Sequence, residues 1–153
     1  MTRDDVVGAA RAWIGTPYRH QASQRGIGAD CLGLVRGIWR EMYGPEPEPV
    51  PPYTPDWAEA LQQDVLLEAA GRHFTELPIG AAQAGDMLVF RMALGHPAKH
   101  CGILSGPDRL IHAYWGRAVC ETRLVSWWSR RRAGAFQFPG LVLTADARSC
   151  DRG

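Results

Sequence analysis

The spacing of the hydrophobic residues changes part-way along this chain of 153 residues, and that change limits the folds it can adopt. Between residues 31 and 42, apolar side chains recur three or four positions apart, which places them on one face of an α-helix. The residues at this spacing are Cys31, Leu34, Val35, Ile38, Trp39 and Met42. From residue 85 onwards, short β-like runs alternate with glycine-containing turns. This order predicts an α+β domain with N-terminal helices packed on an antiparallel β-sheet.

The first half of the chain also contains signals for two more helices and a connector. Thr2 followed three residues later by Asp5 resembles a capping box, so a helix is expected to begin there and to end before Gly15. Residues 44–55 include six prolines, which exclude a helix or a central strand and predict an extended connector. A further helix is expected from residue 55 to about Arg72. Its candidate inward-facing residues are Trp57, Leu61, Val65 and Leu66.

The second half is expected to form the sheet. The β-like runs cover residues 85–92, 99–106, 109–115 and 118–125, with a short helical turn within 125–134 and a last strand within 135–142. Residues 1–144 are predicted to form a single domain, since a chain of this length has little room for two. Residues 145–153 are polar and are expected to form a flexible tail.

Composition and charge exclude several classes of function. The formal net charge is +1 without a basic or acidic block, so no nucleic-acid partner is expected. No apolar run reaches the ~18 residues that a membrane-spanning helix requires. The first residues include two acids and no long apolar stretch, so no secretory signal is expected. The thiols are therefore expected to be reduced.

Cys31 is the cysteine that bears most directly on function. The chain has four cysteines and no C-x-x-C pair, which argues against a zinc knuckle or a thioredoxin motif. Cys31 itself is open to four interpretations, namely core packing, a disulfide, a metal ligand or a nucleophile. It lies in the expected first turn of its helix, where unpaired N–H groups and the helix dipole favour a thiolate. A nucleophilic thiolate needs a base nearby and a group that orients this base.

Two histidines in the second half meet that need if their strands pair. A hairpin centred on Gly106 would place His100 directly opposite His112 on the same face, with Cβ atoms roughly 4.5–5.5 Å apart. His100 would then be the base, and His112 would fix its tautomer. Strand alternation directs Cys101 away from the face of His100, which argues against a zinc site built on both. Residue type alone would allow any other histidine of the chain as the base, so the choice of His100 and His112 depends on their spacing.

Taken together, these segments resemble the NlpC/P60 family of cysteine peptidases, which cut peptidoglycan stem peptides. The resemblance rests on "GTPYRHQ" and "GIGADCLGLV", followed by "GDMLVF", "KHCGILSG" and "RLIHAY" in the family's order and with compatible spacing. These segments lie within residues 3–43 and 84–115. Within the family, "DCLGLVRGIWREMYG" followed by a proline-rich stretch is most similar to the phage-type subgroup, found in the tail gene clusters of phages and gene transfer agents.

The resemblance implies a papain-like α+β fold and assigns roles by position. Cys31 matches the nucleophile, His100 the general base, and His112 the polar residue that orients it. Tyr18 matches a tyrosine whose hydroxyl lies near the thiolate and helps to bind the oxyanion. Asp30 matches an acid that in some relatives helps to hold a substrate amine. No metal and no cofactor are implied.

The chain departs from the family pattern near these residues. Leu32 stands where a serine is usual, and Cys101 replaces an aliphatic residue after the base. Gln21 and Ala22 stand in place of a Gly-Gly pair. None of these changes removes a group with an assigned role, so they bear on substrate specificity rather than on the chemistry.

The function implied by the resemblance is a cysteine endopeptidase, or thiol protease, that hydrolyses peptidoglycan stem peptides, with the bond between D-γ-glutamate and a diamino acid preferred. In the phage-type subgroup it would act from the tail of a phage-like particle, beside tail-hub or baseplate proteins, and open the wall during DNA delivery. It would be made in the bacterial cytoplasm without a signal peptide, join the virion, and act in the cell wall or periplasm. The alternatives are a structural tail-hub component with little activity, and a cysteine amidase or acyltransferase of related fold.

Overall fold

An antiparallel sheet organises the domain. The computed structural model describes residues 1–50, 64–93 and 95–142. The strands of the sheet are β3 (Thr75–Leu77), β4 (Met87–Arg91), β5 (Ala98–Gly106), β6 (Arg109–His112), β7 (Cys120–Arg123) and β8 (Arg132–Gln137). Their spatial order is β3-β8-β4-β5-β6-β7. A separate small ribbon pairs β1 (Ser23–Gln24) with β2 (Gly28–Ala29).

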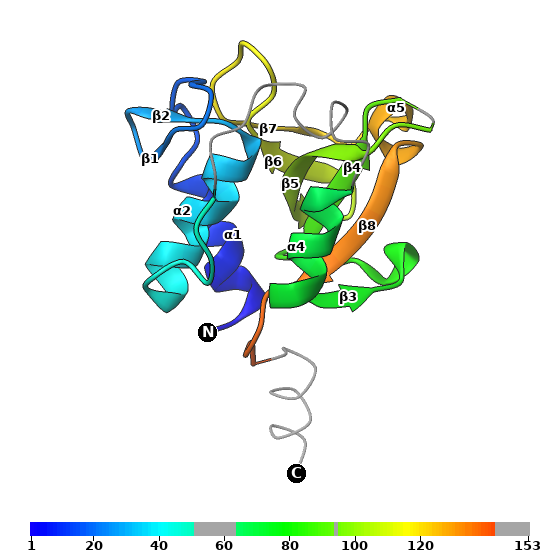
Figure 1. Cartoon of the computed structure of the whole chain (residues 1–153), viewed down its shortest axis with the longest axis horizontal. Coiled ribbons are helices and arrows are strands. Elements are labelled where there is room, and N and C mark those ends of the chain that lie inside the picture. Colours follow the sequence, from blue (N-terminus) through cyan, green and yellow to red (C-terminus); the bar gives the residue numbers. More distant parts are fainter. Residues whose placement is uncertain (51–63, 94, 143–153) are drawn as a thin grey trace.

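Three helices pack on the central strand of this sheet. Helices α1 (Arg3–Arg11), α2 (Cys31–Tyr43) and α4 (Val65–His73) all contact β5 (Figure 1). Helix α5 (Ser126–Ser129) and the 3₁₀ turn η1 (Ile79–Ala81) are short connecting elements. The predicted α+β architecture, with helices on an antiparallel sheet, is confirmed. In the described part of the chain, no helix combines the length and apolar character needed to cross a membrane.

Helices α1 and α2 begin where the sequence signals placed them. Thr2 caps α1 through a capping box with Asp5, as expected. Helix α2 begins at Cys31 and ends at Tyr43, directly before Gly44. Helix α4 begins at Val65 after the non-helical Asp64, so the continuous helix predicted from residue 55 to about Arg72 is wrong at Asp64. The expected start of that helix, with Trp57 and Leu61, lies outside the described residues, as do positions 51–55 of the connector and the tail 145–153.

The four predicted β-like runs each contain an observed strand. The last strand, β8, begins at Arg132 rather than within 135–142 as expected. Strand β3 was not predicted, because its three residues carry no clear alternation and it forms only by pairing with β8 at the edge of the sheet. The ribbon of β1 and β2 was also missed, since each strand has only two residues.

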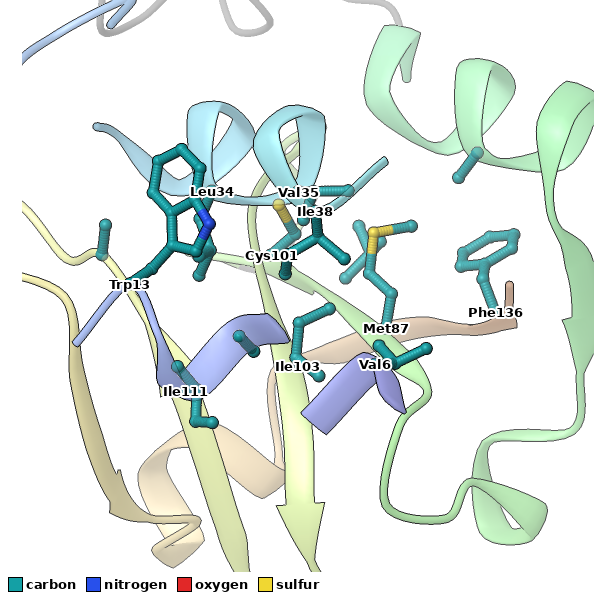
Figure 2. Packing of buried hydrophobic residues seen from close by; sticks show 14 of the residues in the cluster. Val6, Trp13, Leu34, Val35, Ile38, Met87, Cys101, Ile103, Ile111 and Phe136 are labelled. Carbon is teal, nitrogen blue, oxygen red and sulfur yellow. The ribbon is translucent and has the colours of Figure 1, made fainter. Parts of the chain in front are cut away.

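The pleat of the sheet separates two apolar clusters. Met87, Val89, Cys101 and Ile103 belong to the larger cluster, which the helices cover. Figure 2 shows Cys101 and Ile103 beneath Val35 and Ile38 of α2. On the opposite face a smaller cluster gathers Leu88, Phe90, Leu104, Leu110 and Ala135. Because successive residues alternate between these clusters, β4 and β5 are buried on both faces, which explains their nearly continuous apolar sequences.

Two glycines let α2 approach its neighbours closely. A Cβ added to Gly33 would overlap the backbone carbonyl oxygen of Ala22, and one added to Gly37 would overlap the indole ring of Trp13. Trp13 is buried and cannot swing aside without opening the core. The close packing outweighs the roughly 1 kcal/mol that each glycine costs within a helix.

We predict that Gly37→Ala destabilises the protein by roughly 2 kcal/mol, because the new methyl group is forced into a close-packed ring. The matched control is Gly71→Ala in α4, where an added Cβ meets no atom within 4 Å. That change is expected to be neutral or to stabilise by up to about 1 kcal/mol, because alanine has the higher helix propensity. Urea denaturation measures both, and equal effects at the two positions would contradict the packing argument.

Candidate active site

The candidate nucleophile, Cys31, is fixed by the N-terminal cap of α2. Asp30 is the cap residue, and its extended backbone carries a buried carboxylate. One carboxylate oxygen accepts a 2.7 Å hydrogen bond from the backbone N–H of Gly33, and the other accepts a 2.8 Å bond from that of Gln21. Asp30 therefore joins the preceding loop to the first turn of the helix. Cys31 follows at the first helical position, near the positive end of the helix dipole.

The thiol of Cys31 lies against strand β5. Its Sγ atom is 3.8 Å from the carbonyl oxygen of Lys99, and the Sγ atom of Cys101 is 3.4 Å from the carbonyl oxygen of Cys31. Cys101 is fully buried, whereas Cys31 is half-buried. The N-terminus of α2 thus packs directly against β5, the strand that carries His100.

The surroundings of Cys31 favour its thiolate. Hydrogen bonding from Cys101, together with hydrogen bonding and charge from His100, lowers the pKa of Cys31 to about 5, against the opposing effect of burial. The hydrogen bond with Cys31, together with burial, raises the pKa of Cys101 well above its ordinary value, so Cys101 stays a thiol. At neutral pH Cys31 is therefore the ionised member of the pair. A thiolate is the form of cysteine that attacks carbonyl carbons.

The two predicted histidines meet, although not in the expected register. Ile103 pairs with Ile111 and Leu104 with Leu110, so the direct pairing of His100 with His112 predicted from the sequence is wrong. The turn pairs Gly106 with Arg109 instead of centring on Gly106, and the irregularity between Leu104 and Gly106 then leaves the register two residues from the expected one. Because this shift is even, both histidines stay on one face and become diagonal neighbours.

Gly102 makes the diagonal contact possible. A Cβ at position 102 would lie 2.9 Å from the Cβ of His112, so the space opposite His112 is open only because this residue is glycine. His100 fills that side of the strand, and its Nε2 atom lies 2.9 Å from Nδ1 of His112. The predicted proximity of the two imidazoles is thus present in the structure, by a different geometry.

His112 is held as a neutral ring. Burial and the neighbouring His100 lower the pKa of His112 to about 3. Its Nε2 atom lies 3.1 Å from the hydroxyl oxygen of Thr122 on β7. Because a neutral imidazole has one donor and one acceptor nitrogen, the contact with Thr122 also sets which proton arrangement faces His100.

Aromatic side chains enclose the histidine pair. The ring of Trp128 lies 4.9 Å from that of His100 and 5.2 Å from that of His112. Tyr114 and Phe90 contact His100 at 5.6 and 5.8 Å. These rings restrict the rotation of both imidazoles and keep water away from their inner faces. Trp128 is therefore part of the site as well as a cover for the sheet.

Tyr18 lies beside the thiol, as its sequence position suggested. It forms an isolated bridge with Ala29, and its ring packs edge-on against Trp115 at 5.6 Å. Burial, followed by the charges of Cys31 and Asp30, raises the pKa of Tyr18 to about 12. The phenol hence stays protonated and can donate a hydrogen bond near the thiolate.

Gln21 shows the cost of one departure from the family pattern. Its φ angle is 66°, a left-handed conformation that glycine adopts far more easily than glutamine. The hydrogen bond from its backbone N–H to Asp30 holds this turn in place. The loop therefore keeps its geometry although the usual glycine is absent.

Sequence reasoning missed three features of the site. Thr122 is the outer partner of His112, Trp128 covers both imidazoles, and Cys101 contacts the carbonyl of Cys31. Thr122 could have been found by strand alternation once β6 and β7 were aligned, since it shares a face with His112. The long loop between these strands hides that alignment in the sequence.

A sequence model of the NlpC/P60 family matches residues 15–136, a range that includes every candidate site residue. The chain belongs to the NlpC/P60 family. The γ-DL-glutamyl hydrolase of Bacillus subtilis is 27% identical over 139 residues, which cover 90% of this chain and 30% of that protein. The chain thus spans less than a third of the length of this relative.

Solved structures of NlpC/P60 proteins share the fold. The NlpC/P60 domain of the peptidoglycan hydrolase SagA has a TM-score of 0.62 and 23% identity, covering 90% of this chain and 100% of that domain. An NlpC/P60 family protein from Bacillus cereus has a TM-score of 0.65 and 20% identity, covering 90% of this chain and 40% of that one. The papain-like arrangement expected from the sequence is thereby confirmed.

The neutral state of His112 gives a direct prediction. A pKa lowered to about 3 means that its ring stays neutral as the pH falls from 8 to 4, because protonation begins only near pH 3. Its ring C–H signals in NMR spectra should therefore not move over that range, with assignment by comparison with His112→Gln. In the urea-unfolded chain the same signal should titrate near pH 6.5. A midpoint near that value in the folded protein would contradict the burial of this pair.

Proposed function

We propose that this protein is a cysteine endopeptidase that hydrolyses peptidoglycan stem peptides. The observation that carries the proposal is that Cys31, at the N-terminus of α2 and with a lowered pKa, interacts with His100, whose Nε2 atom lies 2.9 Å from Nδ1 of His112. These are the nucleophile, the base and the orienting group that acyl transfer requires. The peptidoglycan hydrolase SagA, which shares the fold, supports the choice of substrate.

In the acylation step, the Cys31 thiolate attacks the carbonyl carbon of the scissile bond. The backbone N–H of Cys31 and the hydroxyl of Tyr18 stabilise the oxyanion that forms. His100, as imidazolium, then gives its proton to the leaving amine while the C–N bond breaks. The acyl group remains on Cys31 as a thioester.

In the deacylation step, water replaces the amine. Neutral His100 removes a proton from the water as its oxygen attacks the thioester carbonyl, and the thiolate leaves to regenerate the enzyme. His112 does not exchange protons with the substrate. Held by Thr122, it orients the His100 ring in both steps.

The bond that we propose is cleaved joins D-γ-glutamate to a diamino acid. The Bacillus subtilis relative is a γ-DL-glutamyl hydrolase, which supports a γ-glutamyl acyl group. Asp30 supplies a buried negative charge beside Cys31, suited to attract a substrate amine on the acyl side. Its backbone bonds to Gly33 and Gln21, with His20 Nδ1 at 3.8 Å, hold this carboxylate in place.

We further propose that the enzyme works in the tail of a phage-like particle. The support is the resemblance of residues 30–44 and of the proline-rich stretch after them to the phage-type subgroup. In this role it would open the cell wall locally while tail-hub or baseplate proteins hold it in place. Co-purification with tail proteins from assembled particles is the observation that would establish the placement.

The proposed activity is tested by digesting purified peptidoglycan with the wild-type chain and with Cys31→Ala. We expect new peptide termini from the wild type only, because Cys31→Ala removes the nucleophile. Mass spectrometry of the fragments identifies the bond. Val142→Ala is the control, since Val142 is exposed and lines none of the described pockets, and it should cleave as the wild type does.

Other outcomes separate the alternatives. Release of whole stem peptides from the glycan would indicate an amidase, and transfer of an acyl group to an added amine would indicate an acyltransferase. Equal absence of products from folded wild-type and Cys31→Ala protein would contradict the enzyme proposal and favour a structural tail-hub component.

A further inference from the structure

A cavity of about 480 Å³ opens beside the outer end of the histidine pair. Its wall includes His112, Tyr114, Arg117, Arg123, Trp127 and Trp128. Tyr114 belongs both to the cavity wall and to the aromatic surroundings of His100, because its ring also lies 5.6 Å from the His100 ring. In Figure 1, the loop between β6 and β7 and helix α5 lie at the same end of the sheet as the N-terminus of α2. His112 and Trp128 on the cavity wall likewise contact the ring of His100, so the cavity adjoins the surroundings of that histidine.

The charge of this cavity is positive. Its lining includes two arginines and no carboxylate side chain. Within the described residues, no ion pair engages the guanidinium of Arg117 or of Arg123, and both residues are exposed. Glu121, the acid next to them on β7, is bound instead to Arg11, Ser105 and Arg109, which hold its pKa at about 2. An uncompensated pair of guanidinium groups at a cavity wall favours a carboxylate ligand.

Two indole rings form an apolar part of the remaining wall. Trp127 is 39% exposed, and its ring lies edge-on to Trp128 at 4.8 Å. The guanidinium of Arg131 stacks over the ring of Trp127 at 3.7 Å and restricts its movement. Such a wall suits an aliphatic chain that ends in a charged group, since the indoles bury the methylene groups while the arginines meet the charge.

We propose that this arginine–tryptophan cavity binds a free carboxylate of the substrate on the leaving-amine side of the scissile bond. The inference rests on the proposed function, in which His100 protonates the leaving amine. The leaving amine must therefore come close to His100, whose neighbours Tyr114 and Trp128 also line the cavity. The carboxylate can come from two sources, namely the side chain of the leaving residue or the end of the peptide.

The test measures the affinity of three synthetic D-γ-glutamyl peptides for the Cys31→Ala protein by isothermal titration calorimetry. In the first, the leaving residue has a side-chain carboxylate and an amidated end. In the second it is lysine with a free terminal carboxylate, and in the third it is lysine with an amidated end. We expect at least one carboxylate peptide to bind about tenfold more tightly than the third. The tighter of the first two identifies the source of the carboxylate.

Removing the arginine charges should abolish this preference. With Arg117→Gln and Arg123→Gln combined, the difference in affinity should fall to about twofold or less. Arg130→Gln, an exposed arginine outside the cavity, should keep it. Equal affinities of the three peptides, no measurable binding, or a preference that survives the double variant would overturn the proposal. A carboxylate preference in a wild-type protein that cleaves none of the three peptides would overturn the proposed function alone.

Discussion

The cap that Asp30 places on helix α2 is the interaction on which the site depends. Its carboxylate holds the backbone N–H groups of Gly33 and Gln21, which joins the loop to the helix and leaves Cys31 at the first helical position. The glycines of α2 then let the helix settle against Trp13 and the β1 region, so its N-terminus reaches β5. The thiol therefore meets the strand that carries the base because of packing formed elsewhere along the helix.

The sheet supplies the other half of the site through an irregular hairpin. Its register turns His100 and His112 into diagonal neighbours, and Gly102 leaves the room that their contact needs. Thr122 and Trp128 then fix the pair from the next strand and from α5. Burial keeps His112 neutral, so this ring adds no charge to the site at neutral pH.

Local signals in the sequence predicted the elements well, whereas contacts between elements were harder to predict. The capping box at Thr2 and the start of α2 at Cys31 follow from hydrogen bonding within a few residues, and both are as expected. The hairpin register was wrong by two, because the turn is not centred on Gly106 and the irregularity beside it leaves no sequence signature. Because the register error is an even number of residues, both histidines still lie on the same face of the sheet. They are therefore close together, as predicted. Asp30 shows a further limit, since its capping role was not recognised beside the role that the family resemblance implied.

The central claim is that the fold holds Cys31 as a thiolate, and an ultraviolet titration of the thiolate absorbance tests it most directly. The signal is taken as the difference between the wild-type protein and Cys31→Ala, followed mainly at and below neutral pH, where burial keeps Cys101 a thiol. The account predicts that the thiolate is present at neutral pH and is lost as the pH falls through about 5. A difference signal that appears only as the pH rises through about 8.5, the ordinary thiol value, would contradict it.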